Sequence, residues 1–106
     1  MATGRLGIAD LAATTITDVY TVPASTVATF TVNVCNRSAA AVTVRLALSD
    51  TTATMGDDEY IEYDVSIPAN GVLERTGLVL DAGKILTAYS SAVGVTVIVY
   101  GIEKGV

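Results

Sequence analysis

Hydrophobic and polar residues alternate along two stretches of the chain, which is the period-two pattern of a half-buried β-strand. The first is TVATFTVNVC at 26–35, where Phe30, Val32 and Val34 share one side and threonine or asparagine lies between them. The second is AVTVRLAL at 41–48, with its apolar side running from Val42 to Leu48. One face of each strand is therefore expected in the core and the other in water or against a partner, as in an antiparallel sheet.

Turn chemistry separates these stretches from further extended segments. The polar loop 49–59 is the longest connection, and shorter turns are expected at NRSAA, PANG and LDAGK. Pro68 fixes φ and lacks an N–H, and Asn70, Gly71 and Gly83 suit positions with positive φ. Between the turns, five more runs are predicted as strands: 18–22, 59–67, 72–80, 85–91 and 95–103.

This spacing of short strands and turns predicts an all-β fold. We expect an antiparallel β-sandwich with jelly-roll-like topology, built from about seven or eight short strands in a single domain spanning 16–106. Residues 1–15 are rich in Ala and Gly and poorly patterned. They are predicted to form an N-terminal arm, irregular or with a helical turn around LGIADLAA, which orders when the protein docks.

The composition favours burial of the protein surface against partners. Charged residues make up 16% of the 106-residue chain, against about 25% in an average soluble domain, and mean hydropathy is +0.54. No run approaches the ~18 consecutive apolar residues of a membrane span, and the N-terminal residues do not resemble a secretory signal. We therefore expect a homo-oligomer or an assembly subunit, with no membrane partner.

The charge distribution argues against a nucleic-acid partner. The net charge is −5, and no basic patch exists among the six scattered cations, which are Arg5, Arg37, Arg45, Arg75, Lys84 and Lys104. Neutralisation of phosphates supplies most of the affinity in nucleic-acid binding.

The sequence offers little catalytic chemistry. Histidine is absent, so the single cysteine, Cys35, cannot act in a Cys–His pair; we read it as a structural strand residue, with an intermolecular disulfide as the alternative. Neither a nucleophile elbow nor a phosphate-binding glycine loop is present. We expect no enzyme activity, no catalytic residues and no cofactor.

Two residue sets leave alternatives open. Five acids lie within eight residues, and those at 62 and 64 are expected on one strand face: Asp57, Asp58, Glu59, Glu62 and Asp64. Their spacing is not that of an EF-hand, so solvated acids are expected rather than a metal site. The five tyrosines are read as packing residues, with a ligand groove as the alternative: Tyr20, Tyr60, Tyr63, Tyr89 and Tyr100.

Three segments together resemble a module of tailed-bacteriophage structural proteins. DVYTVPASTVATFTVNVCNRSAAAVTVRLALS resembles its "YTVPA", "VCN" and "VTVRLA" strands, and YIEYDVSIPANGVLERTGLVLDAGK is similar to its "YIxYDxxIPAN" and "TGLxLxAG" half. The end, VTVIVYGIE, resembles its final strand. The resemblance spans residues 18–103 and brings no catalytic residues with it.

The resemblance implies a non-enzymatic virion structural protein. Such a subunit would be made in the host bacterial cytoplasm and would dock on other virion proteins, either as capsid decoration or on the tail, collar, baseplate or fibre. The alternative is a receptor- or carbohydrate-binding tip module of a tail fibre, which requires aromatic platforms and polar hydrogen-bonding groups on exposed loops. The loop 49–59 has acids and hydroxyls but no aromatic residue before Tyr60.

Overall fold

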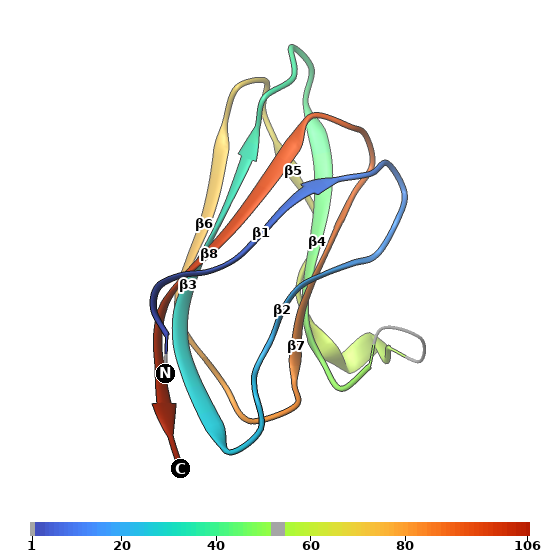
Figure 1. The fold of residues 1–106 in the computed structure, drawn as a ribbon. Helices are drawn as coiled ribbons and strands as arrows, with labels where there is room; N and C mark the ends of the chain where they lie inside the picture. Colours follow the sequence, from blue (N-terminus) through green and yellow to red (C-terminus); the bar gives the residue numbers. More distant parts are fainter. Residues whose placement is uncertain (1, 52–54) are drawn as a thin grey trace.

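The computed structural model describes residues 2–51 and 55–106, and eight strands in two four-stranded antiparallel sheets account for most of them. One sheet has the order β1-β8-β3-β6 and the other the order β2-β7-β4-β5, which is the strand order of a jelly roll. The two sheets form the layers of a sandwich (Figure 1). The predicted fold class is confirmed.

The strands follow the predicted runs closely after residue 16. Their bounds are β1 (Thr3–Leu11), β2 (Thr17–Thr21), β3 (Thr26–Asn36), β4 (Val42–Ser49), β5 (Tyr60–Ile67), β6 (Val72–Leu80), β7 (Ile85–Ser90) and β8 (Val95–Gly105). A 3-10 turn, η1 (Asp57–Glu59), lies in the predicted loop 49–59, of which residues 52–54 lie outside the described part.

Residues 3–11 correct the prediction of an N-terminal arm. They form β1, an edge strand paired with β8 from Thr3 to Leu11, and not an irregular or helical segment. The pattern was obscured by a bulge, because Arg5 pairs with Tyr100 and Gly7 with Val99, leaving Leu6 as an extra residue. The bulge reverses the alternation, so that Leu6, Ala9 and Leu11 all pack on the core.

The core lies between the two sheets and is built from the alternating positions that the pattern predicted. Phe30, Val32 and Val34 of β3 are buried against it. Gly101 of β8 pairs with Phe30, and a Cβ there would meet the Thr29 carbonyl oxygen at 2.1 Å. Glycine at 101 thus permits the close approach of the two central strands.

Four connections gather at one end of the sandwich, and the two termini lie near the other end (Figure 1). The connections join β1 to β2, β3 to β4, β5 to β6 and β7 to β8. The predictions of positive φ in two turns can be compared with the structure. They hold for Asn70 (φ 58°) in the turn 68–71 and for Gly83 (φ 82°) in the next turn. Gly71 instead lies against Pro68, where a Cβ would approach the proline ring to 2.9 Å. Within residues 2–51 and 55–106, no helix is long and apolar enough to cross a bilayer.

Candidate functional site

Cys35 and the acid-rich segment do not converge on a reactive centre. Cys35 is a free, half-buried thiol on the outward side of β3. Both carboxylate oxygens of Glu59 accept backbone N–H groups, from Gly56 at 2.9 Å and Asp50 at 3.0 Å. In the described part of the chain, no three acidic or thiol side chains are grouped so that they could hold a metal ion.

Glu62 and Asp64 were expected on one face of a strand, and that expectation is wrong. Between the pairs Val44↔Val65 and Leu46↔Glu62, β5 has one residue more than β4. Asp64 takes up the bulge with φ 53°, a left-handed conformation that aspartate tolerates better than most residues. The bulge turns Glu62 toward Arg75 and Asp64 toward Arg45.

Three of the five tyrosines gather around Arg45 on the outer side of the β2-β7-β4-β5 sheet. We call this group the tyrosine–arginine patch, and it consists of Arg45, Tyr60, Tyr63, Asp64 and Tyr89. The Arg45 guanidinium carbon lies 4.3 Å from the ring centre of Tyr63 and 4.6 Å from that of Tyr89. Tyr63 is 58% exposed, so the patch presents aromatic surface to solvent.

Hydrogen bonds fix the patch in place. Arg45 donates from Nε to one carboxylate oxygen of Asp64 at 2.7 Å and from a terminal nitrogen to the other at 3.3 Å. These hydrogen bonds, more than the charge of Arg45, hold the pKa of Asp64 below its usual value. Tyr60 meets Tyr63 edge-on at 4.9 Å between ring centres. The arginine is thus held by two rings and a bidentate carboxylate, an arrangement that lysine cannot reproduce.

The remaining two tyrosines serve separate roles. Tyr20 is buried, packs edge-on against Phe30 and donates its hydroxyl to Glu103 at 2.6 Å, which confirms the packing interpretation for this residue. Tyr100 lies on the outward side of β8 and donates to Glu74 of β6 at 3.1 Å. Of the five tyrosines, Tyr60 lines an open pocket of about 490 Å³ beside the loop 49–59, together with Asp58 and Glu59.

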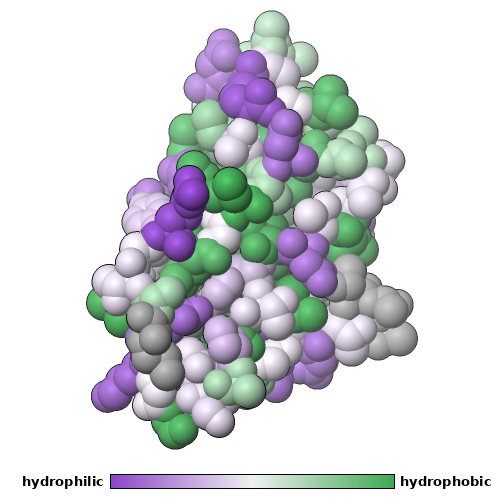
Figure 2. Space-filling view, in the orientation of Figure 1, coloured by the Kyte–Doolittle hydropathy of each residue, from purple (hydrophilic) through white to green (hydrophobic). Residues whose placement is uncertain are grey.

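The outward side of the β1-β8-β3-β6 sheet carries five exposed large hydrophobic residues, and we call it the outer face. Its central strands carry Ile98, Tyr100 and Ile102 on β8 beside Thr29, Thr31 and Asn33 on β3. Four aliphatic residues on it are between 55% and 58% exposed: Ile8, Val72, Val79 and Ile102. Figure 2 shows hydrophobic residues exposed where β1 crosses the molecule, with hydrophilic residues scattered among them.

A shallow groove lies on the outer face along β1 and β8. It has a volume of about 400 Å³ and is lined mainly by apolar atoms, from Arg5, Ile8, Ala9, Asp10, Thr96 and Ile98. Contiguous exposed apolar surface of this kind marks interaction sites in soluble proteins.

All four edge strands are bulged. The register shifts in the β1–β8, β2–β7, β3–β6 and β4–β5 pairs, and in each case the extra residue belongs to the edge strand. The central pairs β3–β8 and β4–β7 run without a shift. Bulged edges are poor templates for another strand, so edge-to-edge pairing of copies is disfavoured.

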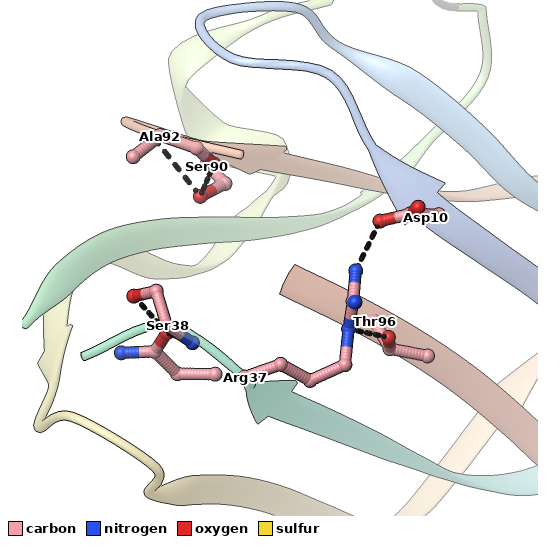
Figure 3. A network of polar contacts seen from close by, with 7 residues as sticks. Asp10, Arg37, Ser38, Ser90, Ala92 and Thr96 are labelled. Carbon is pink, nitrogen blue, oxygen red and sulfur yellow. Dashed lines mark hydrogen bonds and ion pairs between the residues drawn. The ribbon is translucent and has the colours of Figure 1, made fainter. Parts of the chain in front are cut away.

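A polar network joins strands and turns at the loop end of the sandwich. Arg37, just after β3, reaches across β8, where its Nε donates to Thr96, and its terminal nitrogen pairs with Asp10 of β1 at 2.6 Å (Figure 3). Beside it, the fully buried Asn36 donates from its amide nitrogen to the carbonyl oxygens of Ala40, Ile67 and Pro68. The sequence predicts a turn that begins at Asn36 and does not predict this role. Asn36 directly follows the alternating apolar residues of β3, which is the signal that could have indicated its burial.

Comparisons of the chain with families of proteins, with curated proteins and with solved structures find no match.

Proposed function

We propose that this protein is a non-enzymatic, self-associating structural subunit of a tailed-phage particle, which acts by docking on neighbouring virion proteins. The resemblance of residues 18–103 to phage structural modules motivates the virion context. The jelly roll agrees with that context without requiring it, because the same fold also occurs in lectins and in enzymes.

The observation that carries the proposal is the outer face. A free monomer in water gains nothing from exposing Ile8, Val72, Val79 and Ile102 on the same side of one sheet. Covering that sheet removes apolar surface from water, at roughly 25 cal/mol for each Å². Because every edge strand is bulged, contacts between subunits are expected through faces and loops and not by strand addition.

Two measurements test the proposal. Light scattering after size exclusion, at micromolar concentration, should give a mass above that of the 10.9 kDa chain. Phage particles purified by density gradient from the strain that carries the gene should contain the protein, and immunogold labelling should place it on the particle. A stable monomer, or a protein that stays in the soluble fraction while the particles band without it, would contradict the proposal.

A second candidate function is binding of a receptor or carbohydrate at a fibre tip, and the tyrosine–arginine patch favours it. An exposed tyrosine ring beside an arginine and a carboxylate is a surface on which a sugar can stack and hydrogen-bond. A glycan array tests this directly. Tyr63→Ala should abolish any binding at the patch, whereas Tyr100→Ala, on the opposite sheet, should leave it unchanged. An array without signal would exclude carbohydrate binding and leave the first function in place.

A further inference from the structure

We infer that the partner covering the outer face is a second copy of this chain, placed by a two-fold axis that runs along the strands between β3 and β8. The inference rests on the proposed function, and it names which surface self-associates and in which register. Such an axis puts β8 of each copy over β3 of the other and preserves position along the strands. It also puts β1 of each copy over β6 of the other.

The sizes of the side chains match in this arrangement. The outward residues of β8 are large, and the outward residues of β3 beside them are smaller: Ile98 pairs with Asn33, Tyr100 with Thr31 and Ile102 with Thr29. We call each set of residues that pair side by side across the strands a row. Under the proposed axis, each large residue of one copy faces the smaller residue of the same row in the other copy. Interdigitation of large and small side chains is how sheets pack face to face.

The charges match as well. Arg5 lies on β1 in the Tyr100 row, and Glu74 lies on β6 in the neighbouring row, across from Asn33. Within residues 2–51 and 55–106, neither of the two forms an ion pair. The proposed axis brings Arg5 of each copy over β6 of the other, one row from Glu74, which is about 7 Å along the strand and within reach of an arginine side chain.

A two-fold axis that runs across the strands fits poorly. It places every strand over its own copy, so that β8 lies on β8 and the large residues meet one another. Centred on the Tyr100 row, it also sets Arg5 against Arg5, and like charges in contact disfavour association.

The area is sufficient for a specific dimer. The four strands have nine or eleven residues each. At about 3.3 Å per residue and about 4.8 Å between strands, the face covers roughly 600 Å². Two copies would bury about 1,200 Å², which is at the lower end of stable interfaces. We therefore expect a reversible dimer in solution.

Cross-linking through one introduced cysteine tests the register. In a Cys35→Ser background, Thr31→Cys places a single thiol near the axis, with the two α-carbons about 11 Å apart if the sheets pack about 10 Å from each other. A short bis-maleimide should then trap a covalent dimer. Thr43→Cys in the same background is the matched control, because Thr43 is half-buried on the outer side of the other sheet. It should give no dimer.

A charge exchange tests the orientation. Arg5→Glu alone and Glu74→Arg alone should each weaken dimerisation about tenfold or more, and the double variant should recover it. Both residues are exposed, so the fold is expected to persist, and far-ultraviolet circular dichroism checks this.

The outcomes separate this inference from the proposed function. A covalent dimer formed by the Thr43→Cys variant, or a dimer whose affinity does not change with the charge exchange, overturns the inference. Neither result contradicts the proposed role as a virion subunit. A dimer with the expected behaviour from a protein absent from purified particles supports the inference and overturns the virion role. A stable monomer overturns both.

Discussion

Asn36→Ala should destabilise the protein more than most single substitutions in it. The Asn36 side chain is completely buried at the end of β3. Its amide nitrogen donates to the carbonyl oxygens of Ala40 at 2.9 Å, Pro68 at 3.0 Å and Ile67 at 3.2 Å. Its oxygen accepts from the backbone N–H of Ser38 at 3.0 Å and from the Ser38 hydroxyl at 2.7 Å. One residue thus joins the β3–β4 connection to the β5–β6 turn.

The magnitude follows from which of these groups can find another partner. The Ser38 hydroxyl, with its single proton, can turn to the Ala40 carbonyl oxygen, which lies 2.9 Å away. The carbonyls of Ala40 and Pro68 lie in part-buried surroundings that water reaches. The hydrogen bond to the Ile67 carbonyl is buried, whereas that from the Ser38 N–H is part-buried. A buried group left without a partner costs about 1–3 kcal/mol, and each further hydrogen bond that is lost costs about 0.5–1.5 kcal/mol, so we expect a loss of about 3 kcal/mol. For a domain of this size that corresponds to a fall in Tm of roughly 12–24 °C.

The assay is urea unfolding followed by far-ultraviolet circular dichroism, since the chain has no tryptophan. Self-association would make stability depend on concentration, so each variant is measured at two protein concentrations. The control is Asn70→Gly, at the turn that Asn36 holds. Asn70 has φ 58°, which glycine adopts freely, and its backbone N–H to the Ser38 carbonyl is retained.

A loss below 1 kcal/mol for Asn36→Ala would refute the reasoning, and so would an equal loss in both variants. The first result would mean that water replaces the amide group. The second would mean that the turn, and not the buried amide, determines stability at this end.

Three further outcomes are expected. Gly101→Ala should cost more than 3 kcal/mol by thermal unfolding, because its methyl group would overlap the Thr29 carbonyl; Gly77→Ala, at φ 71° with open space around it, should cost only about 1 kcal/mol. The hydrogen bond from Tyr20, with that from the Ala2 N–H, holds the pKa of Glu103 below its ordinary 4.5. The stability that this pair contributes is therefore present above pH 4.5 and is lost as the pH falls through the lowered pKa. Tyr20→Phe should accordingly flatten the acid side of a plot of Tm against pH, below pH 4.5. Arg45→Lys should reduce the near-ultraviolet circular dichroism of the tyrosines, because lysine cannot stay between two rings and bind Asp64 with two hydrogen bonds; an unchanged spectrum would show that the rings hold their positions without the guanidinium.

The sequence predicted the central strands well, because these have one face fully buried. β3 and β8 pair over their whole length without a shift, so alternation in the sequence is alternation in space. Two of the edge strands, β1 and β5, were predicted less well. In each a bulge adds one residue and reverses the alternation. The extra residue is Leu6 in β1, and Asp64 takes up the bulge in β5; neither residue type marks a bulge in a single sequence.

The surfaces were the least accessible to prediction from the sequence. The tyrosine–arginine patch joins Arg45 of β4 to Tyr89 of β7 and to Tyr63 of β5. It depends on strand order and on the bulge at Asp64, and neither can be read from spacing along the chain. Asn36 was similarly hidden, because its partners lie up to 32 residues away.

The bulges in the edge strands help to explain why the chain carries so little charge. A low-charge β-protein can associate through strand edges or through a sheet face, and composition does not separate the two. Here each of the four edge strands carries an extra residue, whereas the outer face is regular across its centre. The two central strands carry no charged side chain at the middle of the face, which spans Thr29–Asn33 on β3 and Ile98–Ile102 on β8. The cation and the anion beside this uncharged centre are Arg5 and Glu74, which lie on opposite edge strands. An uncharged centre between opposite charges is a pattern that a two-fold copy of the same surface complements, which is why association is expected through this face.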